Sequence, residues 1–152
     1  MNLNAARVKR FSKRGWLSHR AELSAAREDC RRFGVKTAKE TSPITSLSGG
    51  NQQKVLLGRW ISLQPRVLLL DEPTKGVDVK SRSEIYDLIQ ELVEAGSYVI
   101  VASSDFEELN LLCDRILMLD RGSIRGEIDG HRSSAIHIGR ELHRIQLERV
   151  VN

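Results

Sequence analysis

The sequence between residues 47 and 78 constrains the fold of this chain more than any other stretch. Residues 47–54 read LSGGNQQK, which predicts a glycine-rich turn leading into a helix, with Ser48 as the N-cap. The amides of such a turn, at the positive end of a helix, suit a phosphate group. A tight turn before a capped helix explains the same residues equally well, so the turn chemistry alone leaves both interpretations open.

An apolar run at residues 67–70 ends in two adjacent carboxylates, Asp71 and Glu72. Four apolar residues in a row predict a strand buried on both faces, as in a parallel sheet. Carboxylates at the C-terminal end of such a strand would lie where open α/β sheets have their ligand crevices. Simple solvation, or capping of the next segment, is the alternative role of the two acids.

Helix and strand patterns alternate after this run. Residues 81–94 carry apolar side chains at i, i+3, i+4, i+7 and i+8, which predicts a helix, and a short buried strand follows at 98–102. This order predicts a βαβ unit with parallel strands. A short helix at 105–112 and two strands at 115–120 and 123–128 complete the predicted core.

The two ends of the chain have weaker patterns. Residues 1–32 predict one or two amphipathic helices with a break near Gly15, and residues 35–46 predict a polar connector. After residue 128 the apolar spacing allows one more amphipathic helix. Its apolar positions are Ile138, Leu142 and Ile145.

Charge and cysteine content narrow the class of protein. Residues 1–40 carry 11 Lys and Arg against 4 Asp and Glu, whereas the remainder carries 13 against 16. A basic segment can bind nucleic acid, but sparse aromatic residues favour a solvated helix face, and we expect no nucleic-acid partner.

The two cysteines, Cys30 and Cys113, lack the spacing of a metal site. We therefore expect reduced thiols in a cytosolic protein. No apolar run approaches the ~20 residues of a membrane span, and the N-terminus lacks the apolar core of a signal peptide.

Two motifs, in this order and at this spacing, resemble those of ATP-binding cassette (ABC) ATPases. LSGGNQQK is similar to their signature motif, VLLLDEP at residues 67–73 to their Walker B strand, and GVD at residues 76–78 to their D-loop. The Asn-Gln-Gln after the glycines, together with PTKGVDV at residues 73–79, most resembles the second cassette of the double-cassette ATPases for import of monosaccharides of the ribose, galactose and xylose type.

This resemblance covers roughly residues 30–128 and implies an α/β fold. The expected architecture is a partial P-loop NTPase domain with a parallel sheet core, preceded by part of the helical subdomain. It implies three parts: a partial helical subdomain and connector at 1–46, the C-terminal half of the cassette core at 47–128, and a helical tail at 129–152.

The resemblance also implies roles in the hydrolysis of ATP with Mg2+. Asp71 would bind the magnesium ion, and Glu72 would be the general base for the attacking water. Asp78 would lie on the interface of a head-to-tail dimer of cassettes. It could also be an acid at the start of the helix at 81–94, and both roles can hold together. The signature residues would contact the nucleotide held by the opposite cassette: Leu47, Ser48, Gly49, Gly50 and Asn51.

Two departures from the family pattern change the expectation for catalysis. No Gly-x-x-x-x-Gly-Lys-Ser/Thr occurs in the sequence, so the loop that would hold the β- and γ-phosphates is missing. The position where the family usually has a catalytic histidine holds Ser104, and a hydroxyl cannot replace an imidazole beside the γ-phosphate. We therefore expect weak or absent ATP binding, and no turnover, by the chain alone.

The resemblance implies the C-terminal part of the ATP-hydrolysing subunit of a sugar importer. Its partners would be a second cassette and membrane-spanning permease subunits, and it would lie in the cytoplasm, peripheral on the inner face of the cell membrane. An alternative is a non-catalytic interaction module that supplies Leu47–Asn51 in trans to a P-loop-bearing cassette. Either way, apolar sheet edges near 67–70 or 98–102 are expected to lie open, which predicts marginal solubility without a partner.

Overall fold

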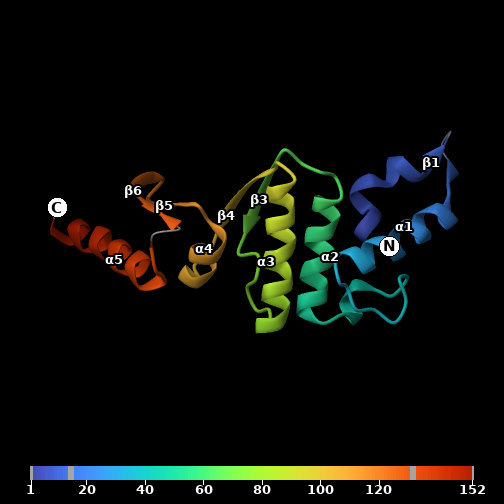
Figure 1. The fold of residues 1–152 in the computed structure, drawn as a ribbon, viewed down its shortest axis with the longest axis horizontal. Coiled ribbons are helices and arrows are strands. Elements are labelled where there is room, and N and C mark those ends of the chain that lie inside the picture. The colour runs from blue at the N-terminus through green and yellow to red at the C-terminus, as the bar shows by residue number, and fades with distance from the viewer. Residues whose placement is uncertain (1, 14–15, 131–132, 152) are drawn as a thin grey trace. The chain divides into compact units, whose positions relative to one another are not determined.

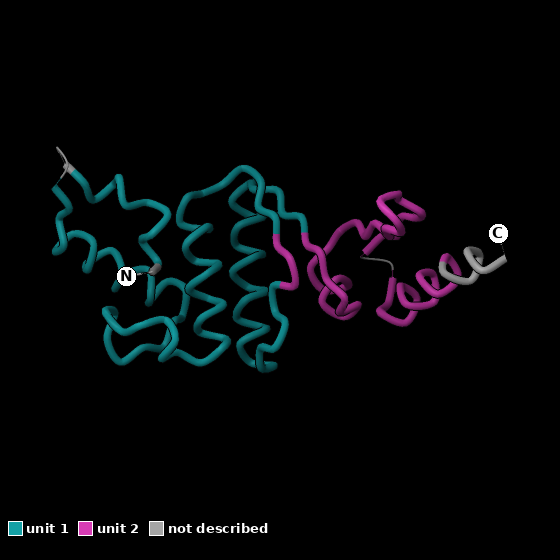
Figure 2. Tube along the Cα trace, turned by 180° about the vertical axis from the view of Figure 1, so that it is seen from behind, with its two compact units in different colours: residues 1–69, 73–100 teal, residues 70–72, 101–152 magenta. Residues whose placement is uncertain are grey.

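The computed structural model describes residues 2–13, 16–130 and 133–151 (Figure 1). The chain divides into two compact units, shown in different colours in Figure 2. Unit 1 consists of residues 1–69 and 73–100, and unit 2 of residues 70–72 and 101–152.

The N-terminal part of unit 1 is less helical than the sequence predicted. A 3-10 helix, η1 (Asn2–Phe11), and two short antiparallel strands, β1 (Ser12–Lys13) and β2 (Trp16–Leu17), precede the helix α1 (His19–Arg32). Two helices separated near residue 15 are therefore confirmed, but the first is a kinked 3-10 helix and a short strand pair separates it from α1; Gly15 itself lies outside the described residues.

Polar contacts to α1 explain the irregular first segment. Asn4 is fully buried, and its Nδ2 donates a hydrogen bond to Glu22 O at 2.7 Å. Arg7 pairs with the buried Asp29, and its own backbone is non-helical with φ of −128°. Anchoring these side chains on α1 takes precedence over a regular helix.

The predicted βαβ pattern follows, and the last residues of its two strands belong to unit 2. After the short 3-10 helix η2 (Ile44–Ser46) come α2 (Gly49–Ile61), β3 (Val67–Asp71), α3 (Val79–Glu94) and β4 (Tyr98–Ala102). β3 and β4 form a two-stranded sheet. Tyr98 N donates to Arg66 O at 2.9 Å, and Glu72 N donates to Ala102 O at 2.8 Å, so the two strands run parallel, as predicted.

The core of unit 1 lies along α2 and α3, which stand side by side in Figure 1. The phenyl ring of Phe33 packs directly on Gly58 of α2, where an added Cβ would lie 2.8 Å from ring atom Cε2. The buried apolar residues of the two helices are Val55, Leu57, Ile61, Ile85, Leu88, Ile89 and Leu92.

The described residues bury one face of β3 and leave the other exposed, so the prediction of a strand buried on both faces is wrong for the structure. Leu68 is 8% exposed, whereas its neighbours Val67 and Leu69 are 54% and 71% exposed. Successive side chains of a strand point to opposite faces. An unbroken apolar run predicts that both faces of a strand are buried. It does not indicate whether the same chain supplies the residues that pack on each face.

Unit 2 is built around a hairpin and the C-terminal helix. The helix α4 (Phe106–Leu112) leads into antiparallel β5 (Arg115–Asp120) and β6 (Ser123–Asp129), which are followed by α5 (Ala135–Val151). The hairpin core consists of Ile116, Met118, Ile128 and Ile138, with Leu142 and Ile145 packed against it. The predicted amphipathic tail helix is thus confirmed, and its apolar stripe covers the hairpin.

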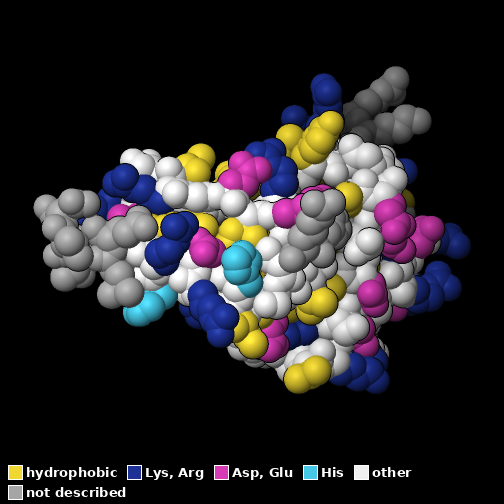
Figure 3. All heavy atoms as spheres, turned by 60° about the vertical axis from the view of Figure 1, so that its left-hand side comes forward, with side chains coloured by type: hydrophobic (Ala, Val, Ile, Leu, Met, Phe, Trp, Pro, Cys, Tyr) yellow, Lys and Arg dark blue, Asp and Glu magenta, His cyan; other side chains and the backbone are white. Residues whose placement is uncertain are grey.

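The surface carries mixed charge and no membrane-spanning helix among the described residues. On the face drawn in Figure 3, lysine and arginine side chains are interspersed with aspartate and glutamate. Within the described part of the chain, no helix combines the length and the apolar character needed to cross a bilayer. Cys30 and Cys113 are free, and burial raises the pKa of each thiol.

Candidate functional site

Ser48 and Gly49, in the turn at the start of α2, are exposed, and the expected serine cap is absent. Ser48 occupies the N-cap position, as predicted, but its side chain makes no capping hydrogen bond to the helix. Its Oγ accepts instead from Nδ2 of Asn51 at 2.8 Å. Leu47 is fixed just before the turn, because its carbonyl accepts from Gln52 Nε2 at 2.8 Å.

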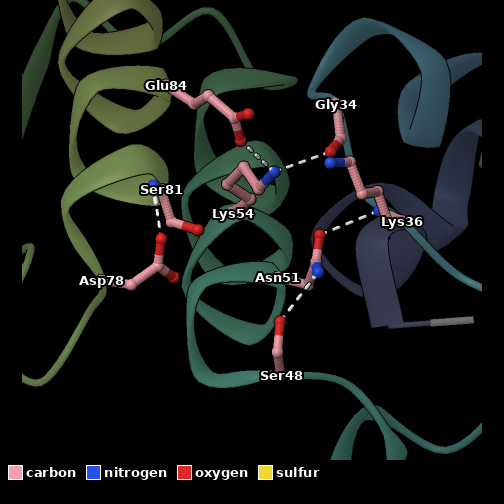
Figure 4. Close-up of polar contacts among 8 residues, drawn as sticks. All are labelled: Gly34, Lys36, Ser48, Asn51, Lys54, Asp78, Ser81 and Glu84. Carbon is pink, nitrogen blue, oxygen red and sulfur yellow. Dashed lines mark hydrogen bonds and ion pairs between the residues drawn. The ribbon is translucent and has the colours of Figure 1, made fainter.

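Asn51 links this turn to the segment that follows α1. Its Oδ1 accepts a hydrogen bond from the amide of Lys36 at 2.8 Å, while its Nδ2 donates to Ser48 (Figure 4). One amide side chain thus spans two segments that lie 15 residues apart in sequence. The sequence predicted that Asn51 contacts the nucleotide. In the structure its side chain holds the side chain of the exposed Ser48 by a hydrogen bond.

Gly50 is required by close packing of α2 on the first turn of α3. A Cβ built on Gly50 would lie 2.5 Å from Ser81 Cβ and 3.4 Å from Asp78 Oδ2. The equivalent atom on Gly49 would come no closer than 3.9 Å to Gly76 O, which is an ordinary contact. The two glycines therefore differ: Gly50 is fixed by its neighbours, and Gly49 faces solvent.

Lys54 is a buried cation that sequence reasoning missed. Its side chain is 2% exposed, and Nζ donates to Glu84 Oε2 and to Gly34 O, both at 2.6 Å (Figure 4). This bond lowers the pKa of the Glu84 carboxyl, and the charges of Lys54, Lys36 and Lys80 act in the same direction. The sequence did contain a signal for burial. Lys54 lies one turn after Gly50, and residues four apart share one face of a helix.

Asp78 forms the N-cap of α3, the structural role that the sequence allowed. Its Oδ1 accepts from Ser81 N at 3.0 Å, and hydrogen bonds from Ser81 lower the pKa of the Asp78 carboxyl. The side chain remains exposed. Asp78 and Gly50 thus meet at the same point, the first turn of α3.

Glu72 has an unusual backbone at the end of β3. Its φ is +47°, in the left-handed region that residues with a Cβ rarely adopt. Its carboxylate Oε1 accepts from the amide of Ser104 at 3.1 Å, and its own amide donates to Ala102 O at 2.8 Å. The structure therefore brings together Glu72 and Ser104, two residues that the sequence placed in one site.

Ser104 contributes its main chain to this contact. Its amide holds the Glu72 carboxylate, and any residue except proline can supply that group. The next residue, Asp105, caps α4, because its Oδ1 accepts from Glu107 N at 3.0 Å and from Glu108 N at 3.2 Å. The loop after β4 is thereby fixed on both sides of Ser104.

The residues around Asp71 fit a magnesium ion only with help from phosphate and water. Asp71 is exposed at the end of β3. Among the described residues, no group of three or more His, Cys, Asp or Glu side chains is placed to hold a metal ion. Magnesium is commonly bound by one or two carboxylates with substrate phosphates and waters, so a single exposed Asp71 meets the protein's share of such a site.

Comparison with known proteins places residues 3–75 in the family model described as ABC transporter. The ribose import ATP-binding protein RbsA 2 of Rhizobium meliloti is 43% identical over 130 residues, which are 86% of this chain and 25% of that protein. The xylose import ATP-binding protein XylG of Burkholderia ambifaria is 45% identical over 126 residues, which are 83% of this chain and 24% of that protein. The chain thus spans about a quarter of the length of the curated relatives that it matches.

Solved structures agree with the sequence comparisons. The ATP-binding cassette MJ0796, in a dimeric post-hydrolysis state bound to ADP and Pi, superposes with a TM-score of 0.69 at 26% identity over 88% of this chain and 58% of that one. MJ1267, an ATP-binding cassette of an ABC transporter, gives a TM-score of 0.71 at 18% identity over 99% of this chain and 61% of that one, which supports the fold alone.

Proposed function

Because this chain belongs to the ABC transporter ATP-binding family, we propose that it is the signature- and Walker B-bearing part of the ATP-binding subunit of a sugar importer. In this role it works on ATP as one of two head-to-tail cassettes. The cassettes lie beneath membrane-spanning permease subunits, on the cytoplasmic face of the cell membrane. The names of the relatives favour a monosaccharide, of the ribose, xylose or galactose kind, as the cargo.

The position of Glu72 is the observation that carries this proposal. Oε1 of its carboxylate is held by the Ser104 amide, so the side chain is oriented before any ligand binds. Oε2 is then the oxygen that takes a proton from the attacking water. Asp71, one residue earlier, would hold Mg2+, and the chemistry that the ion would supply there is neutralisation of the phosphate charge of ATP.

The signature turn has a separate part in the proposal. Ser48 and Gly49 are exposed at the N-terminus of a helix of 13 residues, and Ser48 does not cap that helix. Main-chain donors at such a position favour a phosphate. We assign these donors to the nucleotide of the opposite cassette, with Asn51 holding the serine side chain in position from behind.

A reconstitution experiment tests the proposed function. The partner is the P-loop half, which we define as the stretch of the Rhizobium meliloti ribose import ATP-binding protein that precedes the segment matching this chain and carries a Gly-x-x-x-x-Gly-Lys-Ser/Thr motif. We expect the chain alone to show neither micromolar affinity for Mg-ATP nor turnover, because its sequence has no phosphate-binding loop. Mixed with the P-loop half, it should hydrolyse ATP.

Substitution of Glu72 gives the decisive comparison. Glu72→Gln should lower turnover of the mixture by about 10²–10⁴-fold, the usual effect of removing a general base. The exposed Glu107→Gln is the matched control and should leave turnover unchanged. Turnover that survives Glu72→Gln, or micromolar ATP binding by the chain alone, contradicts the proposal.

The exposed turn favours a second candidate function. The chain would supply Leu47–Asn51 in trans to a cassette that already has its own Walker B strand, without hydrolysing ATP itself. In that case adding the chain to a complete cassette raises turnover, and Ser48→Arg abolishes the gain while Glu72→Gln does not. A gain in ATP turnover that Glu72→Gln abolishes would contradict this second function and support the first.

A further inference from the structure

The short strand pair β1–β2 exposes two large apolar side chains. Trp16 is 84% exposed, and its neighbour Leu17 is 48% exposed. Successive side chains of a strand point to opposite faces, so the pair presents one apolar side chain on each face. Within unit 1 the pair lies at the end away from α3 (Figure 1). Two adjacent apolar side chains left in water favour a partner that removes them from it.

The charge around this strand pair has a single sign. Residues 1–20 contain six Lys and Arg and no Asp or Glu. Lys9 and Arg10, just before the pair, and Arg20, just after it, are exposed. Apolar side chains within a basic segment are complementary to a surface that is apolar inside and negatively charged outside, as an anionic bilayer is. We call five residues the hairpin cluster: Lys9, Arg10, Trp16, Leu17 and Arg20.

Contacts at the base of the strand pair fix it to the rest of unit 1. Ser18 N donates to Phe11 O at 2.9 Å, which closes the base. The guanidinium of Arg7 lies over the Phe11 ring, 5.9 Å from its centroid, and it also pairs with Asp29 of α1. The strand pair is therefore anchored before it meets a surface, which lowers the entropy cost of binding.

The β5–β6 hairpin lacks this combination of features. It also exposes apolar side chains, with Leu119 at 66% and Ile124 at 63%. Its residues 115–129, however, contain three arginines and three acidic residues. Two of these, Arg115 and Glu127, form an ion pair at 2.7 Å. A hairpin without net charge has no net electrostatic attraction to an anionic surface, so β5–β6 provides an internal comparison for the hairpin cluster.

We propose that the hairpin cluster binds directly to an anionic lipid bilayer. Trp16 and Leu17 enter the headgroup region, where an indole ring has its apolar body toward the acyl chains and its N–H among polar groups. The basic side chains lie at the level of the lipid phosphates. Nucleic acid is disfavoured, because the cluster has one aromatic ring and single strands stack on several. The inference rests on the membrane location in the proposed function and adds to it a contact that does not pass through the permease.

Co-sedimentation of the full chain with lipid vesicles tests the proposal. We expect binding to vesicles of equal parts phosphatidylglycerol and phosphatidylcholine, weaker binding in high salt, and little binding to phosphatidylcholine alone. Trp16→Ser should weaken binding to the anionic vesicles by about tenfold, because less apolar area is buried. Lys9→Ser and Arg10→Ser should each weaken it by about fivefold. The matched controls in β6, Ile124→Ser and Arg125→Ser, should bind like the wild type.

Tryptophan fluorescence gives a second measurement that loss of folding would not imitate. The chain has two tryptophans, Trp16 and Trp60. In Trp60→Phe, the emission of Trp16 should shift to shorter wavelength on anionic vesicles and be quenched by brominated acyl chains. In Trp16→Phe, the emission of Trp60, which is 45% exposed on α2, should show neither change. Circular dichroism and the melting temperature of each variant establish which of them are folded before binding is compared.

Three results would overturn the proposal. One is binding to anionic vesicles that Trp16→Ser and Lys9→Ser leave unchanged although both variants are folded. Another is binding without any change in Trp16 emission. The third is absence of binding to lipid alone, with binding only when the vesicles contain the permease or when nucleic acid is offered instead. Failure of the proposed function looks different, because vesicle binding without ATP turnover in the mixture with the P-loop half supports lipid contact and contradicts hydrolysis. Turnover without vesicle binding does the reverse.

Discussion

The signature turn in unit 1 and the end of β3 in unit 2 are fixed by different kinds of contact. Side chains hold the turn: Asn51 braces Ser48, and Gly50 lies against Ser81. Main-chain groups hold the end of β3, since Glu72 contacts the Ser104 amide and the Ala102 carbonyl. The turn should therefore be sensitive to which residues surround it, and the strand end should depend on backbone geometry.

The largest effect is expected at Gly50. Gly50→Ala places a Cβ 2.5 Å from Ser81 Cβ, which forces α2 and α3 apart and should destabilise the chain by about 3 kcal/mol. Gly49→Ala is the matched control, because its Cβ meets only ordinary contact, and alanine favours a helix by up to ~1 kcal/mol over glycine. Chemical denaturation measures both free energies of unfolding.

A double substitution separates steric clash from other causes. Ser81→Gly removes the side chain that the new methyl group would meet, so Gly50→Ala should cost much less in that background. If Gly50→Ala is as stable as Gly49→Ala in the wild-type background, α2 and α3 do not pack through Gly50.

The next largest effect concerns the buried ion pair of Lys54 and Glu84. Glu84→Gln removes the negative charge beside the buried Lys54 ammonium and leaves only neutral acceptors, the Gly34 carbonyl and the glutamine amide oxygen. Removing one partner of a fully buried pair costs about 3–5 kcal/mol. We expect about 2 kcal/mol, because the Glu84 side chain is 35% exposed and water screens part of its charge.

The exposed pair of Arg32 and Glu91, at 4.0 Å, provides the control for that substitution. Glu91→Gln should change the free energy of unfolding by less than about 0.5 kcal/mol. Equal effects of the two substitutions would mean that burial of Lys54 contributes nothing to the strength of its ion pair.

The sequence predicted regular elements well where their own residues determine them. The periodic apolar side chains of α3 and the turn at Gly122 between β5 and β6 gave bounds close to those observed. Lys54 was missed, because a lysine in a helix is normally solvated and only the neighbouring helix makes it buried. The double burial predicted for β3 was wrong, because an apolar run does not specify which polypeptide covers it.

The site residues divide in the same way. Adjacent carboxylates after an apolar run placed Asp71 and Glu72 at a strand end, as observed. The left-handed backbone of Glu72 and its bond to the Ser104 amide could not be predicted, since glutamate has no preference for that conformation. The side chain of Ser48 accepts from the Asn51 side chain and does not cap a backbone amide of α2; this arrangement could not be predicted, because the amide of Lys36 in another segment helps to hold Asn51.

Acid should weaken the ion pair in a defined range of pH. Lys54 holds the pKa of Glu84 below its ordinary value of 4.5, so the folded state gains stability from the carboxylate above that value. That gain is lost as the pH falls from about 4.5 through the lower pKa of the folded state. The difference in free energy of unfolding between wild type and Glu84→Gln should be constant from pH 7 to 5 and shrink below pH 4.5. A difference that grows in acid would contradict the direction of the shift.

The smallest effect on the free energy of unfolding is expected at Glu72. There we expect glycine to be more stable than alanine, the reverse of the usual preference in a helix. At φ of +47° a side chain with a Cβ is strained by about 1 kcal/mol, and glycine is not. Both Glu72→Gly and Glu72→Ala lose the bond to Ser104, so their difference isolates the backbone, and the glycine variant should be more stable by about 1 kcal/mol. At Gln90, exposed in the middle of α3, the order should reverse, with alanine more stable than glycine by about the same amount. If alanine is favoured at both positions, the backbone at Glu72 is not left-handed, and the main chain does not hold the carboxylate that we assign as the general base.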